Sequence, residues 1–238
     1  MAGPGETAAV LAGGQGTRLA SALPGVPKSL APVAGEPFLA RLLRWLAAEG
    51  VPRAVLLCGH LAPAVEEFAG GWNAAGRSPA LEVSAEPEPL GTGGAVRRAL
   101  ERLPQEFYLL NGDSLCPVRL AALAAAHGAW GADATLTAVH QEEGAARGAL
   151  ELDGEDRVRG FAEKARSGPG WINAGVYRLR RSLFEALPAG RPASLERDLL
   201  PDWIARGLPV RAFCAQAPFL DIGTPQDWER AQHEGWLP

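Results

Sequence analysis

Lysine is almost absent from this chain of 238 residues, which contains only Lys28 and Lys164 among its 23 lysines and arginines. An exposed positive charge can be carried by either residue type. A compact ammonium group against a phosphate oxygen, in contrast, is not easily replaced by the planar fork of a guanidinium group. The many alanines, glycines and prolines indicate a compositional bias that also favours arginine. We therefore expect the two lysines to serve chemistry, with chance survival as the alternative.

Cysteines, histidines and long apolar runs are also scarce. Cys58, Cys116 and Cys214 show neither zinc-ligand spacing nor a disulfide pattern, so we expect buried thiols in a reducing cytoplasm. No apolar run approaches the ~18 residues of a membrane span, and the first residues lack the pattern of a signal peptide. A net charge of −4 without basic runs argues against nucleic acid as the main partner. These absences predict a cytoplasmic protein with neither a membrane nor a nucleic-acid partner.

A glycine-rich loop follows the first apolar run. Ala8–Leu11 is typical of a buried parallel strand, and it leads directly into glycines that let backbone N–H groups approach a ligand closely. An arginine at the start of an expected helical turn and a lysine after a proline follow this loop. Together they predict a phosphate site in an enzyme that handles a nucleoside triphosphate. The residues expected to contact the nucleotide here are Leu11, Ala12, Gly13, Gly14, Gly16, Thr17, Arg18 and Lys28.

Two better-known glycine loops do not fit this stretch. The dinucleotide fingerprint G-x-G-x-x-G requires a third glycine where this chain has Leu19. A Walker loop requires a glycine directly before the lysine, whereas Lys28 follows Gly25-Val26-Pro27. The remaining alternative is a tight strand-to-helix turn without a ligand, and the two nearby cations argue against it.

Strand and helix patterns alternate in the first half of the chain, and short strands with turns dominate the second half. We expect strands at 8–11, 51–58, 81–84 and 107–110, with helices at 38–49, 62–68, 91–103 and 118–129. Further strands are expected at 134–140, 149–152, 158–161, 172–179 and 210–214, with helices at 194–205 and 225–234. The predicted fold class is α/β, with a doubly wound, mostly parallel, Rossmann-like sheet and an antiparallel extension.

Seven short motifs occur in order along the chain. They are L-A-G-G-Q-G-T-R-L…P-K at 11–28, E-P-E-P-L-G-T-G-G-A at 86–95, L-N-G-D at 110–113, F-A-E-K at 161–164, I-N-A-G-V-Y at 172–177, S-L-E-R-D at 194–198 and F-L-D-I-G-T-P at 219–225. Through them the chain resembles the sugar-1-phosphate nucleotidyltransferases, also called sugar nucleotide pyrophosphorylases. Within that family it looks most similar to the D-glycero-α-D-manno-heptose 1-phosphate guanylyltransferases, and uridylyl- and thymidylyltransferases share much of the pattern. The resemblance implies one GT-A-like nucleotidyltransferase domain over 1–238, with a nucleotide-binding half at about 1–115 and a sugar-phosphate-binding half at about 116–238.

Two aspartates are candidate metal ligands. Asp113 follows the strand expected at 107–110, at the strand end where doubly wound sheets bind ligands, and Asp221 lies in another apolar-to-glycine turn. The resemblance implies metal ligands at both positions. Two carboxylates together with phosphate oxygens would suit Mg²⁺. For each aspartate alone, a helix cap or a turn is the alternative.

Glu86 lies five residues before Gly91, where the resemblance places the side chain that reads the base. An ionised carboxylate only accepts hydrogen bonds, and the Watson–Crick edge of guanine offers two donors, N1–H and N2–H. Glu86 therefore favours GTP, whereas uracil or thymine would suit an amide. The nearby Glu88 could equally be a charge exposed to solvent. Gly91 and Thr92 are the other residues of this motif that we expect to bind the nucleotide.

The resemblance also implies a pocket for the sugar phosphate. Lys164 would bind the phosphate and Glu163 would accept hydrogen bonds from sugar hydroxyls, with a surface charge pair as the alternative. Arg147 stands where relatives often have an aromatic residue, and Arg197 stands where a lysine is common, which leaves the sugar open. The residues expected on this side are Asn111, Gly148, Glu163, Lys164, Asn173 and Gly175.

The implied reaction is an in-line attack of a sugar 1-phosphate oxygen on the α-phosphorus of the nucleotide. Positioning and charge neutralisation carry such reactions, so we expect Arg18, Lys28 and Asp113 as catalytic residues and Mg²⁺ on Asp113 and Asp221 as the cofactor. The expected partners are a nucleoside triphosphate, with GTP favoured, and a sugar 1-phosphate, in a monomer or homodimer. The alternatives are a uridylyl- or thymidylyltransferase acting on a hexose or amino-sugar 1-phosphate, and a catalytically silent nucleotide-sugar sensor.

Overall fold

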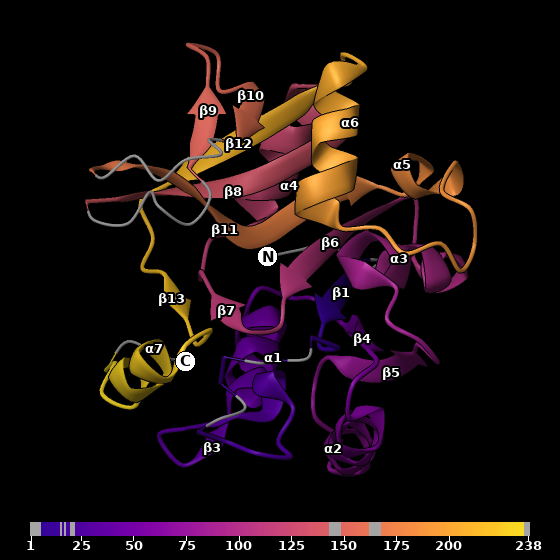
Figure 1. Cartoon of the computed structure of the whole chain (residues 1–238), viewed down its shortest axis with the longest axis vertical. Coiled ribbons are helices and arrows are strands. Elements are labelled where there is room, and N and C mark those ends of the chain that lie inside the picture. The colour runs from indigo at the N-terminus through magenta and orange to yellow at the C-terminus, as the bar shows by residue number, and fades with distance from the viewer. Residues whose placement is uncertain are drawn as a thin grey trace.

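A seven-stranded sheet forms the centre of the molecule (Figure 1), in a computed structural model that describes residues 6–14, 16, 18–19, 22–142, 149–161 and 168–235. The strand order is β12-β8-β11-β6-β1-β4-β5. β11 runs antiparallel to both of its neighbours, and the other pairs in the sheet are parallel. This arrangement confirms the predicted fold class. The strands are β1 (Thr7–Leu11), β4 (Arg53–Cys58), β5 (Ala80–Ala85), β6 (Glu106–Asn111), β8 (Ala134–Gln141), β11 (Gly170–Arg180) and β12 (Val210–Ala215).

Two hydrophobic cores lie on opposite faces of the sheet, because successive side chains of a strand point to opposite sides. In β1, Ala8 and Val10 belong to one core and Ala9 to the other. Burial on both faces explains why this strand is apolar throughout. The first face is covered by α1 (Phe38–Ala48), α2 (Ala62–Ala74), α4 (Leu120–Ala129) and α7 (Pro225–Ala231), and the second by α3 (Gly91–Arg98), α5 (Ser182–Glu185) and α6 (Leu200–Ala205).

Several short elements were not predicted, because two to four residues cannot display a periodic pattern. They are η1 (Lys28–Leu30), β2 (Pro32–Val33), β3 (Glu36–Pro37), β7 (Ser114–Leu115), α5 and β13 (Leu220–Asp221). The helix expected at 91–103 appears as α3 followed by the short helix η2 (Leu100–Arg102). The expected strands at 149–152 and 158–161 appear as β9 (Leu150–Leu152) and β10 (Val158–Phe161), which pair with each other in a separate two-stranded sheet.

The helix expected at 194–205 is divided in two. It consists of a π-helical turn, η4 (Leu195–Leu199), followed by α6. Pro201 has no N–H to donate to the carbonyl of Arg197, so it belongs in the first turn of a new helix. Ser194 caps η4, because its hydroxyl accepts a hydrogen bond from the Arg197 N–H.

The segment around β13 closes against the middle of the chain. β13 pairs antiparallel with β7, and Ile222 donates its N–H to the carbonyl of Asp113 at 3.0 Å. The following helix, α7, is hydrogen-bonded to β2 through residues toward its C-terminal end. Trp228 Nε1 and Gln232 Nε2 both donate to the carbonyl of Pro32, at 2.8 Å and 3.0 Å. The last helix is therefore tied to the β2–β3 turn that follows η1.

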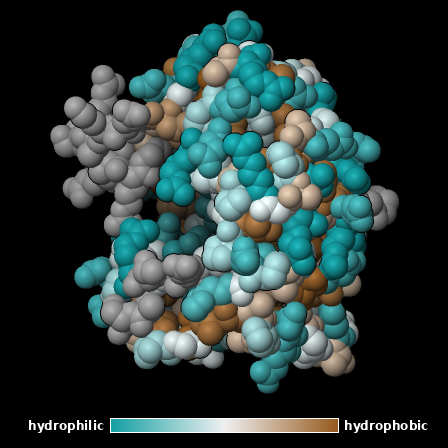
Figure 2. Space-filling view, turned by 45° about the vertical axis from the view of Figure 1, so that its right-hand side comes forward, coloured by the Kyte–Doolittle hydropathy of each residue, from teal (hydrophilic) through white to brown (hydrophobic). Residues whose placement is uncertain are grey.

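The visible face in Figure 2 is mainly hydrophilic, with hydrophobic side chains in separate areas. Among the helices that the structure describes, none is both long and apolar enough to cross a membrane.

Cys58 and Cys116 are buried, and burial raises the pKa of their thiols to about 11 and about 12, whereas Cys214 is half-buried. The division of the chain into a nucleotide half and a sugar-phosphate half stays a prediction.

His127 is fully buried on α4. Its Nδ1 lies 2.8 Å from the Thr135 hydroxyl and its Nε2 lies 3.9 Å from a carboxylate oxygen of Glu106. Burial dominates its titration and lowers its pKa to about 4. The charged groups that face the ring are Glu106, Asp133, Arg178 and Arg180.

This burial predicts a pH-dependent stability. Histidine in an unfolded chain titrates near pH 6.5, so between about pH 6.5 and about pH 4 the unfolded state binds more protons than the folded state. As the pH is lowered from about 6.5 to about 4, the free energy of unfolding should therefore decrease, by up to about 3 kcal/mol. Urea unfolding from pH 7.5 to 4.5 should show this slope for the wild type and a shallower slope for His127→Gln. The exposed His140 provides the control His140→Gln, and identical slopes in all three proteins would contradict the prediction.

Candidate active site

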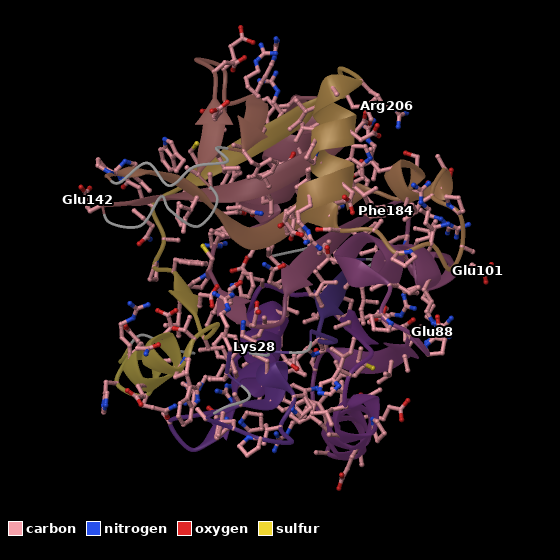
Figure 3. The ribbon with its side chains drawn as sticks, in the orientation of Figure 1. Lys28, Glu88, Glu101, Glu142, Phe184 and Arg206 are labelled. Atoms are coloured by element: carbon pink, nitrogen blue, oxygen red, sulfur yellow. The ribbon has the colours of Figure 1, made fainter. Side chains whose placement is uncertain are left out.

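Lys28 and Asp113 form the centre of the candidate site. Lys28 begins η1 and lies toward the middle of the molecule (Figure 3), and Asp113 lies two residues beyond β6. The Lys28 Nζ is 2.5 Å from the Asp113 Oδ2, and the two side chains are 13% and 35% exposed. Gly16, with a φ of 56°, packs its backbone on the lysine, so that an added Cβ would lie 3.3 Å from the Lys28 Cβ. The glycine loop thus holds the lysine against the end of β6.

Asp221 joins this pair from β13. Its register partner is Ser114, and its Oδ1 accepts a hydrogen bond from the Gly223 N–H. A Cβ on Gly223 would lie 2.5 Å from that oxygen and 3.1 Å from the Lys28 Nζ, so the two charged groups meet over this glycine. Burial and then the charge of Asp113 raise the pKa of Asp221, whereas Lys28 lowers it. Two carboxylates close to each other and to only one cation would be stabilised by the binding of a second cation.

A cleft of about 160 Å³ opens beside this cluster, and we name it the phosphate cleft. Gly112 allows the ends of β1 and β6 to approach there, since an added Cβ would lie 2.4 Å from the Leu11 carbonyl oxygen. The cleft is lined by Leu11, Ala12, Gly14, Lys28, Ser29, Thr92, Asn111, Gly112, Asp113 and Glu196.

A second cleft of about 370 Å³ adjoins the first, and we name it the base cleft. One Glu86 oxygen accepts a hydrogen bond from the Leu90 N–H at 3.3 Å, and the other would lie 2.5 Å from a Cβ on Gly59. Burial raises the pKa of Glu86, whereas Glu88 is exposed at the margin of the molecule (Figure 3). Mostly apolar walls with a few polar groups, here Glu86 and Arg197, are typical of a small-molecule site. The lining residues are Leu11, Gly13, Gly14, Leu57, Glu86, Pro89, Gly91, Thr92, Ala95 and Arg197.

Three of the expected sugar-side residues lie together next to the phosphate cleft. The pairing of β11 with β8 shifts register between Asn173 and Tyr177, and Gly175 within that bulge has a φ of 71°. A Cβ on Gly175 would lie 2.6 Å from the Asn111 Nδ2. Asn173 accepts from the Gly175 N–H at 3.1 Å and donates to the Tyr177 hydroxyl at 2.6 Å, and that hydroxyl lies 3.4 Å from Glu196. The bulge thus places Gly175 against the Asn111 side chain, which lines the phosphate cleft.

The structure does not place every expected residue. Thr17, Gly148, Glu163 and Lys164 lie outside the described residues, as does Arg147. Arg18 is exposed in the turn after the glycine loop and lines neither cleft, so its contact with the triphosphate stays a prediction.

Glu196 is a site residue that the sequence reasoning missed. It lines the phosphate cleft, and its Oε2 accepts a hydrogen bond from the Thr92 hydroxyl at 3.1 Å. The S-L-E-R-D motif contained this glutamate, but only the neighbouring Arg197 had drawn attention, as a departure from a common lysine.

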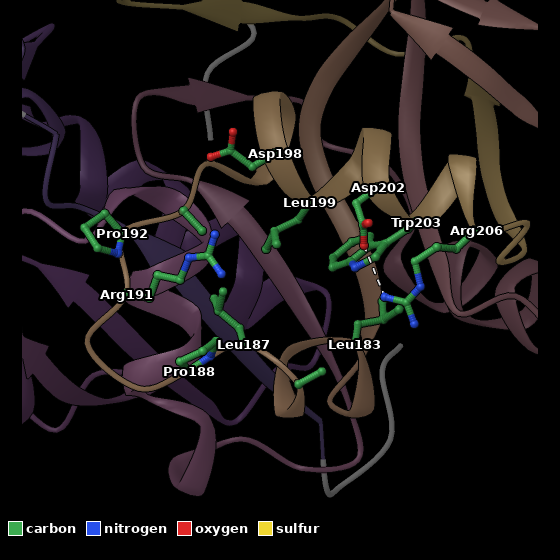
Figure 4. Close-up of a pocket in the computed structure, with 12 residues that line it drawn as sticks. Leu183, Leu187, Pro188, Arg191, Pro192, Asp198, Leu199, Asp202, Trp203 and Arg206 are labelled. Atoms are coloured by element: carbon green, nitrogen blue, oxygen red, sulfur yellow. Dashed lines mark hydrogen bonds and ion pairs between the residues drawn. The ribbon is translucent and has the colours of Figure 1, made fainter.

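A separate cleft of about 520 Å³ lies between α5, η4 and α6 (Figure 4). Leu187, Pro188 and Trp203 form much of its wall, and the Arg206 guanidinium donates to Asp202 at 3.1 Å. Of the expected site residues that the structure describes, none lines this cleft. Those expected site residues that line a cleft line the phosphate cleft or the base cleft instead.

Comparisons with known proteins show which proteins the chain is similar to. A family model described as "Nucleotidyl transferase" matches residues 7–235. Mannose-1-phosphate guanylyltransferase from Mycobacterium tuberculosis is 36% identical over 226 residues, which cover 94% of this chain and 62% of that protein. D-glycero-alpha-D-manno-heptose 1-phosphate guanylyltransferase from Aneurinibacillus thermoaerophilus is 32% identical over 228 residues, which cover 95% of this chain and 97% of that protein. The chain thus spans less than two thirds of the first relative and nearly all of the second.

Solved structures show the same fold. The crystal structure of HddC from Yersinia pseudotuberculosis has a TM-score of 0.85 at 31% identity and covers 95% of this chain and 98% of HddC. HddC complexed with GMP-PN has a TM-score of 0.84. The resemblance drawn from seven motifs is therefore confirmed over nearly the whole length: the chain belongs to the nucleotidyl transferase family.

Proposed function

We propose that this chain is a sugar-1-phosphate guanylyltransferase, which transfers GMP from GTP to a sugar 1-phosphate and releases pyrophosphate. The observation that carries the proposal is the adjacency of the two clefts. Glu86 offers acceptors for guanine in one, and Lys28 and Asp113 meet in the other. The relatives named guanylyltransferases and the HddC complex with GMP-PN support a guanine nucleotide.

The first candidate acceptor is D-glycero-α-D-manno-heptose 1-phosphate, because the match to the relative of that name covers 97% of its length. Mannose 1-phosphate is the second candidate, because the mycobacterial relative is 36% identical. Both names describe a manno-configured ring. Asn111 and Asn173 carry amides that both donate and accept, which suits sugar hydroxyls.

The reaction would be an in-line displacement at phosphorus. An oxygen of the sugar phosphate attacks the α-phosphorus, the bond from that phosphorus to the oxygen bridging to the β-phosphate breaks, and pyrophosphate leaves with the electron pair. The attacking phosphate is already an anion at neutral pH, so no general base is needed. Lys28 would neutralise the charge that builds on the α-phosphate, and the N–H groups of the glycine loop would hold the phosphate chain.

Asp113 and Asp221 fit a Mg²⁺ site. Mg²⁺ is usually held by one or two carboxylates together with substrate phosphates, and within the described parts of the chain no larger cluster of histidine, cysteine or acidic side chains competes for it. The pKa of Asp221 is raised in part by Asp113, so the two carboxylates repel each other in a way that a dication would relieve. When bound, Mg²⁺ would neutralise phosphate charge and orient the phosphate oxygens.

Pyrophosphate release in the presence of Mg²⁺ tests the proposal. The assay should cross GTP, ATP, UTP and dTTP with the 1-phosphates of the heptose, mannose, glucose and N-acetylglucosamine. We expect turnover with GTP and a manno-configured sugar. Turnover with UTP or dTTP instead would keep the reaction class and reject Glu86 as the guanine reader. A nucleotide-dependent rise in melting temperature without pyrophosphate in any combination would favour a nucleotide-sugar sensor.

A further inference from the structure

The base cleft contains one charged side chain of each sign. Glu86 follows β5, and Arg197 reaches the cleft from η4. Arg197 is exposed, and its guanidinium has no hydrogen-bond or ion-pair partner among the described residues. The adjacent residue, Glu196, lines the phosphate cleft instead. Two consecutive residues of η4 therefore serve two different clefts.

The chain before η4 is held closely against α3. The N–H groups of Gly93 and Gly94 donate to the Ala193 carbonyl at 2.8 Å and 3.2 Å, and the Ala193 N–H donates to the Leu90 carbonyl at 2.8 Å. A Cβ on Gly91 would lie 2.7 Å from the Ala193 oxygen, and the φ of Gly91 is 70°. The glycines of this turn are thus needed for the close approach of the two backbones.

Further contacts fix the turn of η4 itself. The Leu195 N–H donates to the Thr92 hydroxyl at 2.6 Å, and that hydroxyl donates to Glu196 at 3.1 Å. The Ser194 hydroxyl accepts from the Arg197 N–H at 3.2 Å. Because the backbone on both sides of Arg197 is restrained, this residue is held at the wall of the base cleft.

Guanine presents complementary groups on two neighbouring edges. Its Watson–Crick edge donates through N1–H and N2–H, and its adjacent edge accepts through O6 and N7. An ionised glutamate only accepts, and an arginine only donates, through a rigid fork. Adenine replaces the O6 acceptor with an amino donor and the N1 donor with an acceptor, so it would oppose both residues.

We propose that Arg197 donates hydrogen bonds to O6 and N7 of guanine while Glu86 accepts from N1–H and N2–H. This inference rests on the proposed function and adds a second residue that determines its base specificity. Arg197 lines the base cleft and not the phosphate cleft, which favours a role toward the base rather than the phosphates. One bidentate arginine–guanine pair contributes roughly 5- to 150-fold to discrimination.

Nucleotide affinities measured without a sugar 1-phosphate can distinguish the contacts to the two edges of guanine. Calorimetry would compare GTP with 7-deaza-GTP, which lacks the N7 acceptor, and with ITP, which lacks the N2 amine. We expect the wild type to bind each analogue several-fold more weakly than GTP. Arg197→Met should remove the difference between GTP and 7-deaza-GTP and keep that between GTP and ITP. Glu86→Gln should do the opposite, and Arg197→Lys should restore only part of the N7 preference, because a point charge cannot span both acceptors.

Arg206→Met is the matched control, since Arg206 lines the cleft behind η4 and pairs with Asp202. Melting temperatures would verify that all variants fold. Equal wild-type affinity for GTP and 7-deaza-GTP would overturn the inference. The same holds if Arg197→Met lowers the affinity for GTP and for 7-deaza-GTP by the same factor. Either result leaves the proposed function standing if GTP still supports turnover. Absence of GTP binding, with turnover on another triphosphate, would overturn both.

Discussion

Replacing Lys28 with alanine is expected to lower the kcat of pyrophosphate release by roughly 10²–10³-fold. The Nζ of Lys28 lies where the glycine loop, Asp113 and Asp221 meet, so its charge acts on phosphate groups in a partly closed site. The charge on the α-phosphate grows toward the transition state, and an interaction that strengthens there changes kcat more than KM. The KM for GTP should therefore change by less than about 5-fold. Steady-state kinetics with both substrates varied measures this split.

Lys28→Arg is the informative companion variant. It keeps the positive charge but replaces a compact ammonium group, 13% exposed against the Gly16 backbone, with a larger planar fork. We expect it to recover only a small part of kcat. An unchanged kcat in Lys28→Ala would remove the residue from the mechanism, and full activity in Lys28→Arg would mean that charge alone suffices.

Asp113→Ala is expected to lower Mg²⁺-dependent activity by roughly 10³-fold or more while the protein still unfolds cooperatively. The side chain of Asp113 is 35% exposed and belongs to neither hydrophobic core, so its removal should leave packing intact. Its loss leaves Asp221 as the single carboxylate beside Lys28. Pyrophosphate release over a Mg²⁺ titration would measure the effect.

The control for Asp113→Ala is Asp202→Asn, which removes a carboxylate from the cleft behind η4. A second readout does not depend on turnover. Mg²⁺ should raise the melting temperature of the wild-type protein with GTP, by mass action on the folded state, and should do so less for Asp113→Ala. Wild-type activity in Asp113→Ala, or an unchanged response to Mg²⁺, would refute the metal assignment. EDTA should abolish activity of the wild type and of Asp202→Asn alike.

Local signals made much of the fold predictable. β1 is apolar on both faces and leads into a loop in which Gly13 lies too close to the Gly59 backbone for a side chain and Gly16 has a φ of 56°. Helix α1 carried regular apolar spacing, and it appears within one residue of the expected bounds. Helix α2 continues to Ala74, six residues beyond the expected end at 68. The bulge in β11 was not predicted, because a register shift depends on the neighbouring strand and leaves little trace in one segment.

The site was predictable in its residue types and less so in its contacts. Scarcity of lysine singled out Lys28, but its ion pair with Asp113 joins residues 85 positions apart, which spacing cannot reveal. Glu196 was missed for a similar reason. Its position depends on backbone contacts between Ala193 and the glycines of α3, and on a π-helical turn that has no simple sequence pattern.

The pairing of β13 with β7 has a consequence for protein synthesis. Asp113 emerges from the ribosome long before Asp221, and domains fold as their sequence becomes available. A nascent chain that ends before β13 contains the glycine loop, Lys28 and Asp113, but it lacks the second carboxylate, Asp221. Trp228 and Gln232 then bind the carbonyl of Pro32 and retain the late segment. On the proposed mechanism, metal-dependent activity would therefore begin only once residues up to about 232 have left the ribosome.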